Sequence, residues 1–108
     1  MATVSLNGAT LTDWDAFHTE SQQAFGFPDF YGRNMSAWID CLSYLRDEDG
    51  MSRFRLKADE TLQITVLQAD LVRQHAPEIL EELTFCIAIV NERYEDYGEK
   101  PALVLVLR

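Results

Sequence analysis

Few side chains in this sequence have both the type and the spacing that catalysis or metal binding requires. Cys41 and Cys86 are far apart, with no CxxC motif and no histidine at metal-ligand spacing, so neither a zinc site nor a redox motif is expected. Paired carboxylates such as Asp47 and Asp49 fall in polar segments, where acids are usually solvated. The sequence contains no glycine-rich phosphate loop and no GxSxG motif. We therefore expect no catalytic residue, no metal and no cofactor.

The cysteines and the histidines have simpler structural interpretations. Both cysteines lie among apolar residues, and we expect reduced thiols in the core rather than a disulfide. His18 falls inside an amphipathic pattern, and His75 stands just before Pro77. We expect both histidines at the surface or at a helix end.

One short segment offers a different chemistry, that of an acid presented on a helix. After Asn34, which is a suitable helix cap, a stripe of apolar residues at helical spacing is expected to be buried. The stripe consists of Met35, Trp38, Ile39, Leu42 and Leu45. At about 100° per residue, the opposite side carries a narrow arc of small, polar and acidic residues. The arc consists of Ser36, Asp40, Ser43 and Asp47. Periodicity alone favours an ordinary exposed acid at Asp40 over a binding site.

Composition restricts the classes of protein and of partner. The 108 residues, 47% hydrophobic and 25% charged, are typical of one globular domain over residues 1–108. Nine basic against 18 acidic side chains give a net charge of −9, which repels phosphate backbones, so direct nucleic-acid binding is not expected. No apolar stretch is long enough to cross a bilayer, and the N-terminus lacks the features of a signal peptide. We expect a cytoplasmic protein that binds no membrane and is monomeric when free.

Hydrophobic periodicity and end signals predict the elements that position these residues. Strands are expected over 3–6, 62–68 and 101–107, the last of them buried on both faces. Helices are expected over 12–25, from 35 to 45 and from 77 to 97, with a helical turn at 70–75. An ordered aromatic loop covers 27–32, and a polar loop over 46–58 contains an extended piece at 53–56. This order predicts an α/β fold with a three-stranded parallel sheet packed with helices.

Two apolar residues of the long helix lie off its main stripe. These are Phe85 and Ile89. Either another element covers them, or they form a small self-association patch.

Residues 27–42 carry a specific motif, Phe-Pro-Asp-Phe-Tyr-Gly-Arg-Asn-Met-Ser-Ala-Trp-Ile-Asp-Cys-Leu. This segment resembles the signature of the barstar family, intracellular protein inhibitors of barnase-type ribonucleases. The matching positions are Pro28, Tyr31, Gly32, Asn34, Ala37, Asp40, Cys41 and Leu42. The resemblance implies a barstar-like fold and binding of a ribonuclease active site by the loop and the helix that follows it.

The resemblance also implies which residues bind the partner. These residues are Asp40, Phe30, Tyr31, Asn34, Ser36, Ile39, Ser43 and Tyr44. A ribonuclease active site is basic because it holds phosphate, and a carboxylate such as that of Asp40 can imitate phosphate there. Ser36 stands where the family has an acid, and Ile39 where it has a tryptophan. The expected partner is therefore a secreted, basic ribonuclease of the barnase-like kind, and the sequence does not decide whether barnase itself is bound.

Other functions stay open at this point. A regulatory or protein-interaction module with the same fold, or an enzyme, would have no ribonuclease target, because fold does not imply function. An enzyme needs a pocket with groups of perturbed pKa, whereas an inhibitor presents a convex or shallow acidic surface. The resemblance does not decide which acid of the long helix, Glu92, Glu95 or Asp96, adds to an interface.

Overall fold

Three parallel strands form the centre of the fold in the computed structural model, which describes residues 2–108. The strands are β1 (Ala2–Asn7), β2 (Leu62–Leu67) and β3 (Leu103–Leu107), in the spatial order β1-β2-β3. Val4 lies opposite Ile64, and Ile64 lies opposite Leu105. The expected α/β fold with a three-stranded parallel sheet is confirmed.

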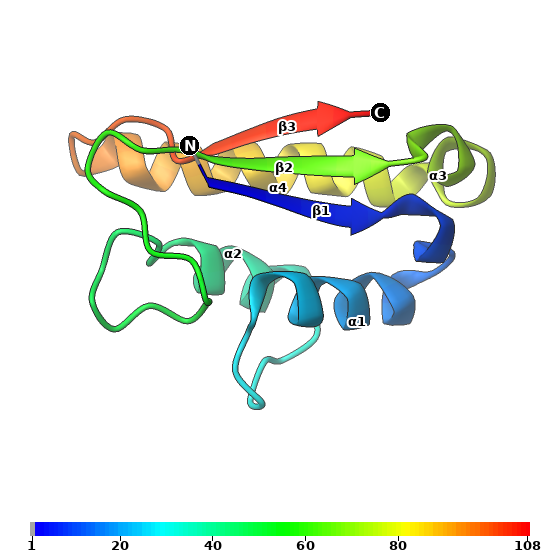
Figure 1. The fold of residues 1–108 in the computed structure, drawn as a ribbon, viewed down its shortest axis with the longest axis horizontal. Helices are drawn as coiled ribbons and strands as arrows, with labels where there is room; N and C mark the ends of the chain where they lie inside the picture. Colours follow the sequence, from blue (N-terminus) through cyan, green and yellow to red (C-terminus); the bar gives the residue numbers. More distant parts are fainter. Residues whose placement is uncertain (1) are drawn as a thin grey trace.

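Within residues 2–108, the strands are connected by four α-helices and one short 3-10 helix. Their bounds are η1 (Gly8–Thr10), α1 (Trp14–Phe25), α2 (Met35–Leu42), α3 (Ala69–His75) and α4 (Pro77–Asp96). Figure 1 shows α4 running behind the sheet, and α1 with α2 below the edge that β1 forms. The helix α2 packs against α4, and α1 packs against β1.

The starts of α1 and α2 are set by capping side chains, each of which accepts a hydrogen bond from the backbone amide three residues later. Asp13 caps α1, because its carboxylate accepts a hydrogen bond from the Ala16 amide at 2.8 Å. The helix therefore begins two residues later than expected. Asn34 caps α2 with its side-chain oxygen, and Pro77 is the first residue of α4, both as expected.

The end of α2 differs from the expectation. The helix stops at Leu42, although the apolar stripe continues to Leu45. Tyr94 of α4 supplies the physical reason, because its hydroxyl donates to the Leu42 carbonyl at 3.0 Å and accepts from the Leu45 amide at 2.8 Å. The Leu42 carbonyl and the Leu45 amide therefore have hydrogen-bond partners without a further turn of helix. Ser43 and Tyr44 consequently lie in a turn after the helix, while Leu45 remains buried.

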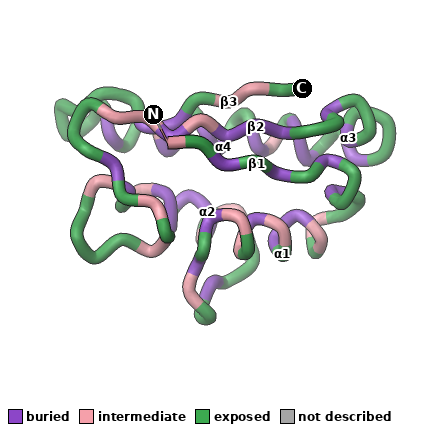
Figure 2. Tube along the Cα trace, in the orientation of Figure 1, coloured by how far each residue is buried: buried purple, intermediate pink, exposed green. Residues whose placement is uncertain are grey.

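The expectation that the last strand is buried on both faces is wrong. Burial alternates along β1, where Val4 and Leu6 are buried and Thr3 and Ser5 are exposed. One face of the sheet is therefore covered by helices, and the other face is open. In β3, Val104 is 42% exposed. Figure 2 shows the exposed and half-buried stretches of β3. A continuous apolar run predicts a strand, but it does not determine which of its faces a helix covers.

The connection from α2 to β2 is irregular. The expected extended piece at 53–56 pairs with no strand in the described chain. Instead, the Arg53 amide donates to the Phe25 carbonyl at 2.8 Å, and the Leu56 amide donates to the Leu45 carbonyl at 2.7 Å. These two bonds attach the connection to the end of α1 and to the turn after α2.

Both cysteines are free and buried, as expected of core thiols. Burial raises the pKa of the Cys86 thiol to about 11, and the neighbouring Glu82 carboxylate acts in the same direction. Burial also raises the pKa of Cys41, with a smaller contribution from Asp40. Neither thiol is poised to react as a thiolate.

The outer surface of α4 is partly apolar. Phe85 is 60% exposed, so no other element covers it, whereas Ile89 is half-buried against the core. None of the helices within residues 2–108 has the length and the apolar character needed to cross a membrane.

Candidate functional site

The aromatic loop between α1 and α2 is attached to α1 through a buried hydrogen bond. The Tyr31 hydroxyl and the His18 Nδ1 atom are 2.6 Å apart. Tyr31 is 6% exposed and His18 is 5% exposed. The expectation that His18 lies at the surface is therefore wrong. His75, in contrast, is exposed at the end of α3, as expected.

The environment of this pair determines which group carries the proton. Burial lowers the pKa of His18 below its ordinary value of 6.5, and the nearby Arg33 guanidinium lowers it further. Burial raises the pKa of Tyr31. The assigned arrangement is thus a protonated tyrosine hydroxyl that donates to a neutral imidazole.

The loop presents one aromatic side chain and buries the next. Phe30 is 77% exposed, whereas the adjacent Tyr31 points into the core. Arg33, which has a positive φ of 53°, donates from Nη2 to the Asp15 carboxylate at 2.8 Å and to the Thr19 hydroxyl at 3.0 Å. The loop is therefore held to α1 at both Tyr31 and Arg33, and Phe30 projects from a fixed base.

The residues expected to bind from α2 divide into three kinds. Asn34 is exposed, but its side-chain oxygen accepts from the Ala37 amide at 2.8 Å and is committed to capping the helix. Ser36 is exposed on the helix surface. Ile39 is only 8% exposed and packs in the core. Ser36 and Asp40 are therefore the two exposed residues of α2.

Asp40 does not stand alone on this surface. Arg93 of α4 donates from Nη1 to the Asp40 Oδ1 atom at 2.9 Å and to the Ser43 Oγ atom at 3.1 Å. The side chains of Asp40 and Arg93 are 58% and 46% exposed. The second carboxylate oxygen of Asp40, Oδ2, makes no hydrogen bond within the described residues.

Sequence reasoning missed Arg93 as a member of the site. It is 53 residues from Asp40 along the chain, and no helical or strand periodicity connects positions so far apart. One feature of the sequence could have drawn attention to it, since Arg93 is the only basic residue in α4.

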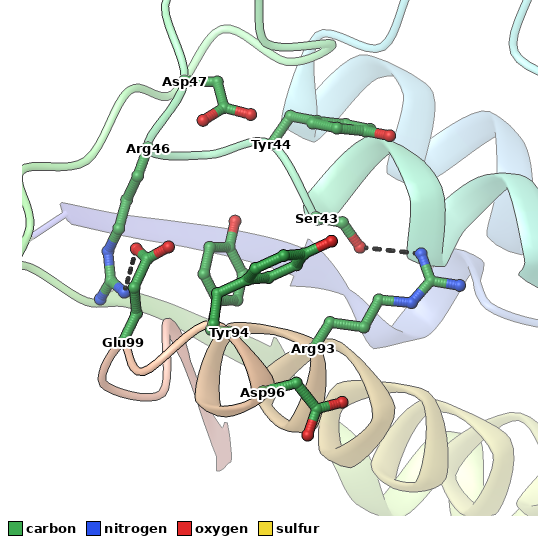
Figure 3. A pocket seen from close by; sticks show the side chains of 9 residues that line it. Ser43, Tyr44, Arg46, Asp47, Arg93, Tyr94, Asp96 and Glu99 are labelled. Atoms are coloured by element: carbon green, nitrogen blue, oxygen red, sulfur yellow. Dashed lines mark hydrogen bonds and ion pairs between the residues drawn. The ribbon is translucent and has the colours of Figure 1, made fainter.

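A hollow of about 740 Å³ opens beside the Asp40–Arg93 pair, between the turn at 43–47 and the segment 93–99. We call it the α2–α4 hollow. Figure 3 shows Tyr44 and Asp47 on the side of the turn, with Arg93 and Asp96 on the side of α4. Tyr44 is 43% exposed, so this expected site residue belongs to the wall of the hollow.

The base of the hollow is a fixed ionic cluster. The side chain of Arg46 is 6% exposed, and its guanidinium donates to the backbone carbonyls of Lys100 at 2.7 Å and of Glu60 at 3.0 Å. The Glu99 carboxylate lies 3.4 Å from Arg46 Nη1. The same guanidinium lies over the Tyr94 ring at 5.1 Å from its centroid. Arg46 thereby joins the chain around residue 60 to the end of α4.

The chemistry that this surface supports is binding. Asp40 supplies an acceptor, Phe30 and Tyr44 supply exposed aromatic surface, and the groups with raised or lowered pKa are buried for structural reasons. Cys41, next to Asp40, is 4% exposed and therefore no candidate nucleophile. Within residues 2–108, no three His, Cys, Asp or Glu side chains come together in a way that could hold a metal ion.

Comparison with known proteins agrees with the motif and with the fold. A protein-family model described as Barstar (barnase inhibitor) matches residues 1–106 of the 108-residue chain. No curated protein matches the sequence significantly. The match extends the resemblance from residues 27–42 to almost the whole chain.

Proposed function

Because the chain belongs to the barstar family, we propose that it is an intracellular, cytoplasmic inhibitor that blocks the active site of a small basic ribonuclease. The description of the family names an inhibitor of barnase, so membership of the family suggests a ribonuclease as the partner. An inhibitor of this kind binds an enzyme and is not itself an enzyme. The proposed partner is a ribonuclease related to barnase.

The observation that carries this proposal is the position of Asp40. It lies at the exposed side of α2, in the Asp-Cys-Leu sequence that the family signature contains, and 58% of its side chain is open to solvent. The active site of a ribonuclease contains positively charged side chains that bind the phosphate groups of RNA. A carboxylate on a rigid helix can occupy such a site and form charge-assisted hydrogen bonds there.

The other proposed site residues differ in their exposure and in their role. Phe30, Ser36 and Tyr44 are exposed and can touch a partner directly. Tyr31 and Ile39 are buried and support this surface from beneath. Asn34 does both, because it caps α2 and remains exposed, and Ser43 fixes Arg93 next to Asp40.

The proposal is tested by measuring inhibition. RNA hydrolysis by barnase, and by other small basic ribonucleases of its type, is titrated with the wild-type protein and with Asp40→Ala. We expect one-to-one inhibition of at least one of these enzymes. Asp40→Ala should weaken it by at least about thirtyfold, or about 2 kcal/mol, the size that defines a binding hot spot; barstar itself is one of the reference cases from which this magnitude is taken.

Glu81→Ala is the matched control for Asp40→Ala. It removes the same charge from an exposed position of α4 that is twelve residues, or about 18 Å, from Arg93 along the helix. Glu81→Ala should inhibit like the wild type. Failure of the wild-type protein to inhibit any basic ribonuclease would favour an interaction module with another target, and equal losses in both variants would remove Asp40 as the centre of the site.

A further inference from the structure

The strand β3 is one edge of the sheet, and its backbone groups point alternately to β2 and outward. The Leu62 amide donates to the Ala102 carbonyl at 2.8 Å. Further along, the Arg108 amide donates to the Val66 carbonyl at 2.9 Å. Because backbone groups in a strand alternate in direction, the even-numbered residues of β3 bond to β2 and the odd-numbered residues point outward. Within residues 2–108, no strand pairs with this outer side.

The fold satisfies only the first of the outward-pointing residues, Leu103. Asn91 of α4 donates from Nδ2 to the Leu103 carbonyl at 3.0 Å, and its Oδ1 atom accepts from the Leu103 amide at 2.9 Å. Its side-chain amide thus takes the place of a neighbouring strand at this point. Leu105 and Leu107 have no such partner in the described chain, so their backbone amides and carbonyls are free to pair with another strand.

The side chains of β3 do not protect this edge. Val104 is 42% exposed and Leu107 is 39% exposed. Residues 101–107 include no charged side chain, and residues 100–108 include no acid. Edge strands of monomeric proteins are usually protected by a charge, a proline or a bulge within the strand. The edge of β3 is therefore suited to pairing with another strand.

The adjacent surface of α4 leaves room for another strand. Thr84 and Ala88 share one stripe of the helix with Asn91, because they precede it by seven and three residues. Both side chains are short and exposed. Figure 1 shows α4 running in the direction opposite to β3, so these residues stand beside the part of β3 that follows Leu103.

The other edge strand, β1, is different. Its exposed side chains Thr3 and Ser5 are polar. Its last outward-pointing amide, that of Asn7, donates to the Glu20 carboxylate at 2.6 Å. The two edges are thus unequal, and β3 is the one that combines free backbone groups with an apolar surface.

From this we infer that β3 pairs antiparallel with β3 of a second copy of the chain, across a two-fold axis at Val106. Leu105 then lies opposite Leu107 of the second copy, and the reverse pair forms as well. These two pairs make four backbone hydrogen bonds, which satisfy every outward group that Asn91 leaves free. An axis at Leu105 would instead place Leu107 opposite Leu103 of the second copy, which Asn91 already occupies.

A second copy suits this edge in charge as well as in hydrogen bonding. Each chain carries a charge of −9, so two copies repel one another over most of their surface. The strand β3 is a segment without acids, and two copies can approach there with the least repulsion. Figure 1 shows α2 beyond β1, on the side of the sheet away from β3, so Asp40 remains accessible on both copies of the pair.

The pair is expected to be weak. The contact involves one strand of five residues from each copy, which is less than the roughly 1,200 Å² that stable interfaces bury. The expectation of a monomer then applies to dilute solution. We therefore expect dimers to accumulate between about 10 μM and about 1 mM protein, the range of weak associations.

Sedimentation velocity over this concentration range measures the pairing. Sodium chloride should increase the dimer fraction, because it screens the repulsion between two acidic chains. Salt therefore acts in the opposite direction to its effect on association with a basic ribonuclease. A protein that stays monomeric at about 1 mM in high salt would overturn the inference, whether or not it inhibits a ribonuclease.

Two lysine substitutions locate the contact. Val106→Lys places two like charges opposite each other at the axis and should weaken pairing by at least about tenfold. Ser5→Lys is the matched control, because Ser5, Thr65 and Val106 lie in one row across the sheet and Ser5 is on the opposite edge. Equal losses in both variants would overturn the inference.

A third variant separates loss of pairing from loss of the fold. Leu107→Pro removes an amide that has no partner in the monomer, and proline is tolerated on the free side of an edge strand. This variant should unfold at a urea concentration close to that of the wild type and should not pair. A folded Leu107→Pro variant that pairs like the wild type would exclude the proposed hydrogen bonds.

Disulfide cross-linking tests the register. Val106→Cys places two thiols on residues that face each other at about 4.5 Å between Cα atoms, which suits a disulfide. Oxidised glutathione takes up the two electrons and two protons and is released as two molecules of glutathione. Both native cysteines are buried. We expect a covalent dimer from Val106→Cys and little from Val104→Cys, although Val104 is the more exposed position. Cross-linking at equal rates would show that this register is wrong.

Discussion

At the residue scale, the ion pair of Asp40 with Arg93 decides what the surface offers to a partner. An isolated exposed aspartate presents both oxygens and its whole charge. Here Arg93 donates to one oxygen, and the Ser43 hydroxyl accepts a second hydrogen bond from the same guanidinium nitrogen and holds it beside Asp40. Because both side chains are about half exposed, water screens the pair, and its contribution to the stability of the fold is small.

A double-mutant cycle measures this contribution. We expect Arg93→Ala and Asp40→Ala each to lower the free energy of unfolding by less than about 1 kcal/mol, with a coupling energy below about 1 kcal/mol. Urea unfolding of the two single variants and of the double variant provides all three values. A coupling above about 2 kcal/mol would instead identify the pair as an ion pair that the fold depends on.

At the element scale, two tyrosine hydroxyls connect the site to the rest of the fold. Tyr31 attaches the aromatic loop to α1, and Tyr94 attaches the end of α2 to α4. All three hydrogen bonds of these hydroxyls are buried, so loss of one partner leaves the other group without water to replace it. The positions of Phe30 and Tyr44 depend on these two connections.

The connection at Tyr31 makes stability depend on pH. Burial holds the pKa of His18 below its ordinary value of 6.5, so the unfolded chain binds a proton that the folded chain resists. The contribution of neutral His18 to the free energy of unfolding is fully present above about pH 6.5. It decreases as the pH falls from that value toward the lowered pKa of His18 in the folded state. Urea unfolding between about pH 8 and about pH 5 should show the loss in the wild type.

His18→Gln is the control for this pH dependence, because it removes the titrating ring and leaves His75 in place. The variant should be less stable at neutral pH and should lose less stability on acidification than the wild type. Parallel pH profiles for the two proteins would show that His18 is not the group responsible.

The connection at Tyr94 predicts a large effect from loss of one oxygen atom. Tyr94→Phe leaves the Leu42 carbonyl and the Leu45 amide without their partner, and we expect a loss of about 2 kcal/mol in the free energy of unfolding. Tyr97→Phe removes the same atom from a residue that is 84% exposed and should change stability little. Similar urea midpoints for the two variants would contradict the role assigned to Tyr94.

At the scale of the whole molecule, net charge governs encounter with a basic partner. The chain carries a charge of −9, and the exposed Asp40 lies at the centre of the proposed interface. Opposite charges attract over a distance that salt shortens, from a Debye length of about 30 Å at about 0.01 M to about 8 Å at about 0.15 M. Electrostatics of this kind acts mainly on the association rate.

We therefore expect the association rate with an inhibited ribonuclease to fall by about tenfold or more over this salt range. Stopped-flow fluorescence at a series of sodium chloride concentrations measures the rate, and a sucrose series controls for general solvent effects. An association rate that salt leaves unchanged would argue against electrostatic steering, whatever the affinity.

Features that depend on neighbours within about four residues could be predicted from the amino-acid sequence. Asn34 caps α2 and Pro77 starts α4, because each signal acts on the adjacent helical turn. The positions of the three strands along the chain followed in the same way from apolar runs and turn residues. The motif at 27–42 identified the family, since its residues are contiguous.

The contacts between elements that are distant in the chain could not be predicted from the sequence. The end of α2 depends on Tyr94, the burial of His18 on Tyr31, and the state of Asp40 on Arg93. The open face of β3 likewise depends on which side of the sheet the helices cover. Each of these features is a contact between segments that no local period relates, so the free energy that selects it exists only after the chain has packed.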